Sequence, residues 1–179
     1  MSWCWYRDNE ELKPHQVKRT VKYGGGGIMI WGFMTAQGPG FMCKLTGSVN
    51  QDLYLSILKD ELVETIEYFG MDSSKIIFQQ DNASCHKASK VLEWLDSQPF
   101  GVMQWPAQSP DLNPIETLWA ILKRRLNQYP NPPTGLLELW ERIEKVWGEI
   151  KPETCQGLIH SMPERIGKVL KARGGWIQE

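Results

Sequence analysis

The chain has 179 residues, which is enough for one domain with a hydrophobic core of its own. Its hydrophobic share of 41% and charged share of 23% are ordinary for a globular protein. Because no apolar run approaches the roughly 20 residues of a membrane span, we expect no membrane partner. The formal net charge of −1 excludes a general attraction to nucleic acid, and four isolated cysteines without a Cys-x-x-Cys pair predict reduced, structural thiols.

Residues 1–27 are predicted to form an irregular, basic N-terminal segment that precedes the main domain. Pro14 interrupts regular structure, and residues 24–27 are four consecutive glycines, which is typical of a hinge or a tight turn. Lys18, Arg19 and Lys22 are candidate DNA-binding residues, because positive charge collects in this stretch without an intervening acid. Most such clusters are solvated surface, and that alternative stays open.

Two strands and a long helix are predicted next. Residues 28–33 and 41–45 are predicted strands that flank the turn sequence Gly38-Pro39-Gly40, which indicates an antiparallel hairpin. Asn50 can cap a helix that runs to Phe69 and stops at Gly70. The inward-facing stripe of this helix comprises Leu55, Leu58, Leu62, Ile66 and Phe69.

The second half of the chain alternates strands with helices and then becomes helical. Residues 75–81 form a short apolar run that ends in polar residues, which is typical of a central strand covered on both faces. The other predicted elements are a helix at 86–97, a strand at 102–105, a helix at 114–128 and two or three helices between 134 and 173. This order predicts an α/β fold with a mixed sheet flanked by helices. We assign to its core Trp31, Trp119, Trp140 and Trp147.

Two carboxylates are the candidate functional residues. Asp81 follows a predicted strand, at the end where ligands collect in open α/β sheets, and Glu116 lies at the start of a predicted helix. Each has a structural alternative, because Asp81 can serve as a turn or cap residue and Glu116 can complete a capping box with Asn113. On a helical wheel, Glu116 lies about 100° from the buried Ile115, at the edge of the apolar stripe. Lys123 follows about two turns later on the same edge and is a further candidate DNA-binding residue.

The pair of carboxylates predicts a site for hard divalent cations. Mg²⁺ and Mn²⁺ bind carboxylate oxygens, and phosphoryl transfer on DNA commonly uses two such ions about 3.5–4 Å apart. Asp81 and Glu116 are therefore predicted to be both metal ligands and catalytic residues. Two carboxylates do not readily hold two ions, so a third is expected.

Several motifs resemble one family of DNA-processing enzymes. They are Gln79-Gln80-Asp81-Asn82-Ala83-Ser84-Cys85-His86, Trp105-Pro106-Ala107-Gln108-Ser109-Pro110-Asp111-Leu112-Asn113-Pro114-Ile115-Glu116, Val21-Lys22-Tyr23-Gly24-Gly25-Gly26, Ile30-Trp31-Gly32 and Ser161-Met162-Pro163-Glu164-Arg165. Thirty-four residues separate Asp81 from Glu116. With this spacing, the motifs resemble the Tc-type branch of the mariner superfamily of transposases, from about Val21 to the end of the chain.

The resemblance implies a ribonuclease H-like fold over residues 28–179, with extra C-terminal helices. It implies an Asp-Asp-Glu triad that binds two magnesium ions, in which Asp81 is the second carboxylate and Glu116 the third. Members of the family cut the ends of their own element and join them to a TA target. The resemblance therefore implies double-stranded DNA as a partner, a homodimer and a nuclear location.

The chain departs from the family pattern in two respects. We find no counterpart of the family's N-terminal helix-turn-helix region or of the first strand, which carries the first Asp. Asp8 follows the aromatic stretch Trp5-Tyr6 and is a tempting substitute, but it lies too close to the glycine run for the family's layout. We therefore expect metal binding and DNA cleavage to be impaired, because residues that act as a unit fail together.

Two other hypotheses remain open. One is a non-catalytic DNA-binding or dimerisation module derived from a transposase. The other is an unstable product, because the loss of a central strand exposes apolar surface at residues 28–33 and 76–78. Oligomerisation, or a replacement strand from residues 2–7, would cover that surface.

Overall fold

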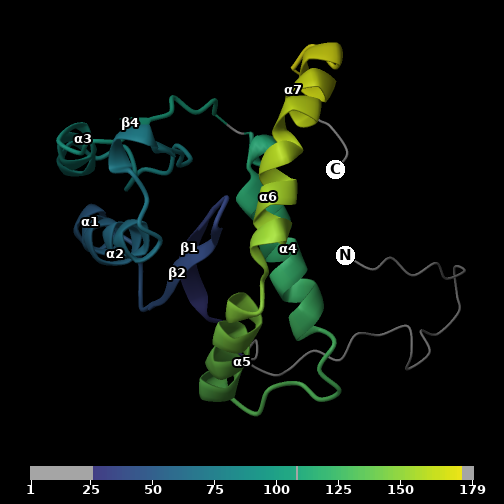
Figure 1. Ribbon diagram of the computed structural model, residues 1–179. Helices are drawn as coiled ribbons and strands as arrows, with labels where there is room; N and C mark the ends of the chain where they lie inside the picture. Colours follow the sequence, from purple (N-terminus) through teal and green to yellow (C-terminus); the bar gives the residue numbers. More distant parts are fainter. Residues whose placement is uncertain (1–25, 108, 175–179) are drawn as a thin grey trace, which may run out of the picture.

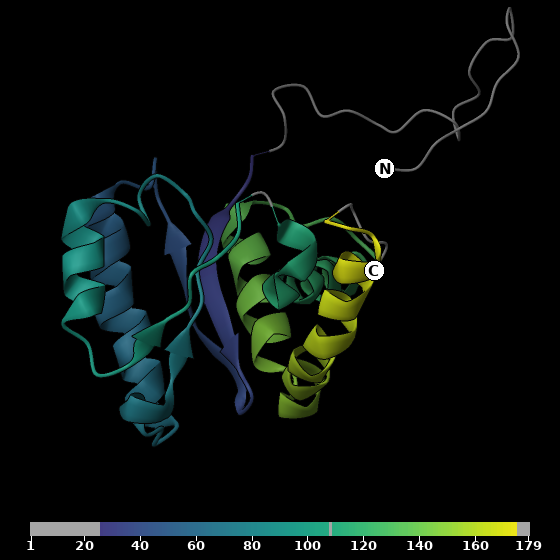
Figure 2. The same cartoon turned by 90° about the horizontal axis from the view of Figure 1, so that it is seen from above.

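Strands in the middle of the molecule lie between two groups of helices (Figures 1 and 2). The computed structural model describes residues 26–107 and 109–174. In chain order the elements are β1 (Met29–Thr35), β2 (Gly38–Leu45), α1 (Gln51–Ile57), a π-helical turn (Leu58–Leu62), α2 (Val63–Tyr68), β3 (Ile77–Phe78), α3 (Ser89–Asp96), β4 (Gly101–Val102), α4 (Pro114–Leu126), α5 (Leu136–Gly148), α6 (Pro152–His160) and α7 (Met162–Lys171). Short 3₁₀ turns precede β3 and α4. Helices α1–α3 lie on one side of the strands and α4–α7 on the other.

The predicted antiparallel hairpin is confirmed. β1 and β2 pair from Met29↔Leu45 to Thr35↔Gly38, with an irregularity between Gly32 and Met34. Gly38 has a φ of +135° in the turn, a conformation that side chains rarely allow.

The long helix after the hairpin is also confirmed, as a continuous α–π–α segment over residues 51–68. The Asn50 side chain accepts hydrogen bonds from the backbone N–H groups of Asp52 and Leu53, at 3.1 and 2.9 Å. Gly70 lies just beyond the end, with a φ of +58°. Leu55, Leu58, Leu62 and Ile66 of the predicted stripe are buried, as are Tyr54 and Ile57. Phe69, the last residue of the predicted stripe, is the half-buried C-cap.

The other two strands differ from the prediction. β3 and β4 are two residues long and form their own parallel pair, so the sheet is divided into two instead of continuous. Phe78 is 7% exposed whereas its neighbour Ile77 is 67% exposed, so β3 is covered on only one face. Within residues 26–107 and 109–174, β4 is the one strand that pairs with β3.

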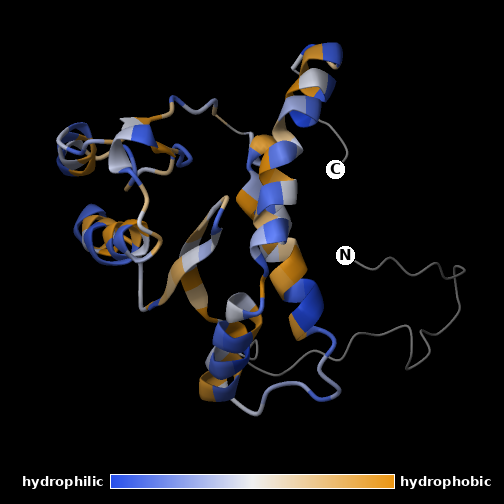
Figure 3. Cartoon of the chain, viewed as in Figure 1, coloured by the Kyte–Doolittle hydropathy of each residue, from blue (hydrophilic) through white to orange (hydrophobic). Residues whose placement is uncertain are grey.

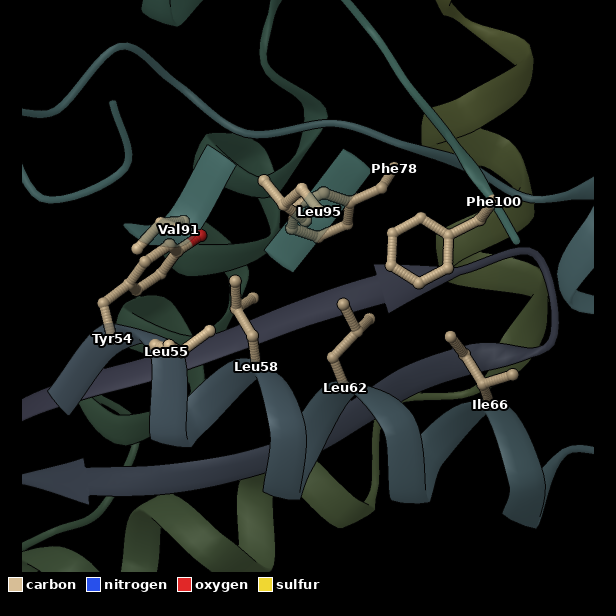
Figure 4. Close-up of a cluster of buried hydrophobic side chains, with 9 residues drawn as sticks. All are labelled: Tyr54, Leu55, Leu58, Leu62, Ile66, Phe78, Val91, Leu95 and Phe100. Atoms are coloured by element: carbon tan, nitrogen blue, oxygen red, sulfur yellow. The ribbon is translucent and has the colours of Figure 1, made fainter. Parts of the chain in front are cut away.

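Two hydrophobic cores lie on opposite sides of the hairpin. The first is drawn in Figure 4 and consists of Tyr54, Leu55, Leu58, Leu62, Ile66, Phe78, Val91, Leu95 and Phe100. The second joins helices α4 to α6 and consists of Leu118, Leu122, Ile143, Val146, Trp147, Ile150 and Cys155. Figure 3 shows hydrophobic residues along the hairpin between them.

The core assignment of the four tryptophans agrees with the structure. Trp147 is 5% exposed and stacks on Trp119, with ring centroids 5.0 Å apart. Trp119 and Trp140 pack against the second core as partly buried residues, and Trp31 packs against the first.

The described cysteines are partly or fully buried. Cys43, Cys85 and Cys155 are free, and Cys4 lies outside the described residues. Burial raises the pKa of Cys155 to about 11, and burial together with the charges of Glu61 and Asp60 raises the pKa of Cys43 to about 11. Both thiols are therefore protonated at neutral pH.

No helix in the described part of the chain combines the length and the apolar character needed to cross a membrane.

β2 is fixed to both helical groups at Gly40. The buried Trp147 indole donates a hydrogen bond to the Gly40 carbonyl at 2.8 Å, and the next backbone N–H, of Phe41, donates to Thr65 Oγ1 at 2.9 Å. A Cβ atom at position 40 would lie 2.4 Å from the Phe33 ring. The close approach of these groups therefore requires glycine.

Gly40→Ala is expected to destabilise the domain by about 1–3 kcal/mol, because the added methyl group overpacks the site against an aromatic ring. The denaturation midpoint in urea measures the effect. Gly157→Ala in α6 is the matched control, because a Cβ there meets nothing within 4 Å. An equal stability of the two variants would contradict the packing argument.

Candidate metal centre

Asp81 lies in the loop after β3, three residues beyond the end of the strand. Its side chain is 59% exposed. The backbone N–H of Ala83 donates to Asp81 Oδ1 at 3.0 Å, and His86 Nδ1 lies 2.7 Å from the same oxygen. An ionised carboxylate only accepts, so Nδ1 is the protonated nitrogen of His86. Within the described residues Oδ2 has no polar partner, which leaves one oxygen of Asp81 available to a ligand.

The buried Tyr54 packs against the loop that carries Asp81. The Tyr54 ring, 1% exposed, stacks on the His86 ring with centroids 4.0 Å apart. Its hydroxyl donates to Gln80 Oε1 at 2.7 Å, and Gln80 Nε2 donates to the His86 carbonyl at 3.3 Å. Burial, with the nearby Cys85 and Asp81, raises the pKa of Tyr54, so the phenol stays a donor. The loop is thus held in place by a helix of the first core.

Glu116 lies in the first turn of α4 on the other side of the hairpin. Asn113 is the N-cap residue, as predicted, and Pro114 opens the helix. The capping box that would explain Glu116 structurally is not formed, because the Asn113 side chain makes no capping hydrogen bond. Asn113 Oδ1 instead accepts from Gln79 Nε2 at 3.3 Å. The Glu116 side chain is exposed and makes no hydrogen bond or ion pair with the described part of the chain.

The Gln79–Asn113 hydrogen bond connects the two candidate segments. It joins a residue two positions before Asp81 to a residue three positions before Glu116. Asp81 and Glu116 line one and the same cavity, with a volume of about 1150 Å³. The arrangement therefore brings the two predicted metal ligands to a common space, while their role stays a prediction.

The carboxylates of Asp81 and Glu116 are the kind of ligand that a divalent cation binds, but the described residues bring too few ligands together for a complete metal site. Free carboxylate oxygens are the ligands that Mg²⁺ and Mn²⁺ prefer. Among residues 26–107 and 109–174, however, no group of three or more His, Cys, Asp or Glu side chains is placed to hold a metal ion. Asp8 lies outside the described residues, so the structure does not test it as a third ligand.

A buried arginine fixes the segment that carries Glu116. Arg165, 9% exposed, donates from Nη1 to the Asp111 carbonyl at 3.2 Å and from Nη2 to Thr117 Oγ1 at 2.9 Å. Its Nε donates to Ser161 Oγ at 3.0 Å. The planar guanidinium thus connects the start of α7 with the turn and the first residues of α4.

The candidate DNA-binding residues divide into two groups. Lys123 is exposed in the last turn of α4, next to the exposed Arg124. It lies two helical turns from Glu116, about 10 Å along the helix axis. Lys18, Arg19 and Lys22 lie outside the described residues.

Sequence comparison identifies the family. Residues 9–134 match the family described as DDE superfamily endonuclease. The chain belongs to this family.

The curated relatives of this DDE endonuclease domain are transposases, as the motifs predicted. The Transposable element Tcb1 transposase of Caenorhabditis briggsae is 32% identical over 161 residues, which are 90% of this chain and 58% of that protein. The Transposable element Tc1 transposase of Caenorhabditis elegans is 31% identical over 174 residues, which are 97% of this chain and 62% of that protein. The chain thus spans less than two thirds of the length of these relatives.

Solved structures confirm the predicted fold class. The catalytic domain of Mos1 mariner transposase matches with a TM-score of 0.75 and 23% identity, over 84% of this chain and 76% of that chain. The Mos1 mariner paired end complex with Mn matches with a TM-score of 0.80 and 22% identity, over 97% of this chain and 52% of that chain. The DDE endonuclease domain therefore has the ribonuclease H-like fold of these catalytic domains.

Sequence reasoning missed three of the residues that position this site. Tyr54 lies four residues before Leu58 and could have been assigned to the buried stripe by its spacing. Gln79 and Arg165 belong to the family motifs, but the sequence predicted no structural role for either. Their tertiary partners, Asn113 and the Asp111–Thr117 segment, are distant in sequence, and no local signal indicates them.

Arg165→Lys is expected to destabilise the domain by about 1.5–3 kcal/mol, the usual loss for a hydrogen bond to a charged group, because an ammonium cannot reach both partners of the fork. Urea unfolding measures the change. Arg124→Lys, at an exposed position of α4, should leave the midpoint unchanged. A fully stable Arg165→Lys variant would show that the fork is dispensable.

Proposed function

We propose that this chain is the catalytic-domain portion of a transposase that cuts and joins DNA strands with the help of divalent metal ions, as part of cut-and-paste transposition. The observation that carries the proposal is the shared cavity lined by Asp81 and Glu116, with no polar contact to Asp81 Oδ2 from the described residues. Membership of the DDE endonuclease family and about 30% identity to transposases support it.

In this proposal Asp81 and Glu116 hold Mg²⁺ or Mn²⁺ through their free oxygens. Bound ions would activate the attacking hydroxyl or water and stabilise the leaving oxygen of the phosphodiester. His86 and the Ala83 N–H orient the Asp81 carboxylate by occupying Oδ1. Hydrogen-bond partners of this kind fix the direction of a metal ligand and strengthen metal binding. The Gln79–Asn113 bond holds the two segments beside each other.

The partners follow from the same proposal. Double-stranded DNA is the proposed substrate, with Lys123 and the basic residues Lys18, Arg19 and Lys22 as proposed phosphate contacts. A structural neighbour, the Mos1 transposase paired-end complex with left transposon end, supports a homodimer for the working protein. The nucleus is the proposed location because chromosomal DNA is the substrate.

A second candidate function is a DNA-binding or dimerisation module without catalysis. The observation in its favour is the shortage of grouped ligands. Asp72 and His86 also line the cavity, but no three metal-ligating side chains come together to hold an ion among the described residues. This candidate predicts DNA binding that weakens with salt, without strand cleavage even at high Mn²⁺.

Asp81→Asn and Glu116→Gln are each expected to weaken Mn²⁺ binding at least about tenfold, equivalent to roughly 1.4 kcal/mol, because each removes an anionic oxygen ligand. Isothermal titration with Mn²⁺ measures the affinity, and a nicked-plasmid assay measures any cleavage. Asp96→Asn and Glu144→Gln are matched controls at exposed positions. An unchanged Mn²⁺ affinity in both site variants would exclude the assigned ligands.

Lys123→Ala is expected to lower the salt dependence of DNA binding by about 0.9 in the slope of log K against log[salt], the contribution of one phosphate contact. Fluorescence anisotropy with labelled duplex DNA at several salt concentrations measures the slope. The control is Lys145→Ala, in the last turn of α5. Equal slopes for the two variants would show that Lys123 makes no contact with the DNA phosphates.

A further inference from the structure

The outer edge of β2, on the side away from β1, has backbone groups that no strand uses. Among residues 26–107 and 109–174, β1 is the one strand that pairs with β2. The N–H of Phe41 donates to Thr65 Oγ1 in α2 at 2.9 Å, so it points away from β1. Because backbone groups alternate in direction along a strand, the N–H and C=O of Cys43 also point away from β1. β2 is therefore an open sheet edge at Cys43.

One face of the helical segment 51–68 borders this edge. Its residues recur at the spacing of a single helical face. We call them the edge-facing stripe; they are Glu61, Glu64, Thr65 and Tyr68. Glu61 lies near Cys43, because burial and the negative charge of Glu61 raise the pKa of that thiol to about 11. Tyr68 lies beside Phe41, with ring centroids 5.4 Å apart. The stripe therefore runs along β2.

The edge-facing stripe carries negative charge that no described cation neutralises. Glu64 is exposed and Glu61 is half-buried, and neither forms an ion pair with residues 26–107 or 109–174. Burial and the charges of Glu64 and Asp60 raise the pKa of Glu61. Because the carboxylates repel one another, a cation beside the stripe would stabilise their charged forms.

Two aromatic rings at the end of the stripe are open to solvent. The Tyr68 side chain is 72% exposed and that of Phe41 is 37% exposed. A guanidinium group stacks on the face of such rings and is attracted by their electrons. Together with the carboxylates, the two rings favour arginine as the cation that binds here.

We propose that the outer edge of β2 and the edge-facing stripe bind an extended, arginine-rich segment of another protein, which adds to β2 as an antiparallel strand. Residues that lie opposite each other in an antiparallel pair point to the same face. An arginine opposite Cys43 therefore points to the stripe, and its backbone forms the hydrogen-bonded pair with Cys43. Backbone bonds give affinity in this mode of recognition and side chains give specificity. The proposal is independent of the proposed function.

Charge excludes two other occupants of this edge. The phosphates of DNA are repelled by Glu61 and Glu64. A second copy of the chain can pair β2 with β2 about a two-fold axis perpendicular to the sheet. That arrangement puts both edge-facing stripes next to each other on the same face, and their like charges repel.

The test adds to the full chain a fluorescent peptide of the length of β2, in which arginine alternates with valine. We expect saturable binding by fluorescence anisotropy and slower hydrogen exchange at the Cys43 amide. With glutamine in place of arginine the peptide should bind at least about tenfold more weakly, because it loses several ion pairs. With N-methyl groups on the arginine amides it keeps its charge but lacks the backbone donors, and should also bind at least about tenfold more weakly.

Variants of the stripe separate this binding mode from non-specific attraction. Glu64→Gln and Tyr68→Ala change exposed side chains, so folding is retained, and each should weaken peptide binding about threefold. Glu144→Gln and Leu137→Ala, at exposed positions of α5, are the matched controls and should not change it. Equal loss in the stripe variants and the controls overturns the proposal.

Hydrogen exchange at Cys43 identifies the occupant of the edge. Peptide binding that leaves the exchange at Cys43 unchanged overturns strand addition, as does equal binding of the N-methylated peptide. A dimer in sedimentation that protects Cys43 without peptide overturns the proposal in favour of a second copy. Protection of Cys43 by duplex DNA alone overturns it in favour of nucleic acid. No saturable binding of the arginine peptide overturns it outright.

Discussion

The alternating side chains of β1 determine how the rest of the molecule is assembled. Trp31 and Phe33 point to the first core, whereas Ile30 and Met34 pack against the second. One strand with two apolar faces therefore joins two helical groups that have separate cores. The hydrogen bonds of Gly40 and Phe41 to Trp147 and Thr65 fix the hairpin to both groups. The two candidate catalytic carboxylates belong to different groups, so the hairpin and the Gln79–Asn113 bond control their approach.

Much of the fold followed from the sequence because its signals are local. The turn at Gly38, the Asn50 cap and the stripe from Leu55 to Ile66 each depend on residues close in the chain, and these elements were predicted correctly. The division of the sheet was not predicted. Whether β3 joins the sheet of β1 and β2 depends on contacts between segments far apart in the sequence, and no local pattern around Ile77 contains that information.

The two carboxylates of the candidate site could be predicted from the sequence, but the residues that position them could not. The motif spacing led to Asp81 and Glu116, and the structure puts both at one cavity. The capping box, the structural alternative for Glu116, is not formed: Gln79 takes the Asn113 oxygen, and the Glu116 side chain makes no hydrogen bond within the described residues. Local sequence rules describe what a side chain can bind, and the tertiary structure decides which partner it binds.

The shortness of β3 and β4 has a consequence for how the protein opens. Two residues in each strand hold this parallel pair, whereas the hairpin is paired from Met29↔Leu45 to Thr35↔Gly38 with one irregularity. Segments with few backbone bonds exchange and unfold locally at lower free energy than a long ladder. The loop that carries Asp81 is therefore attached to one of the weaker parts of the backbone network. A ligand that contacts both the Asp81 loop and the α4 side of the molecule stabilises the closed form of this segment. Part of its binding free energy therefore goes into suppressing local unfolding of β3 and β4.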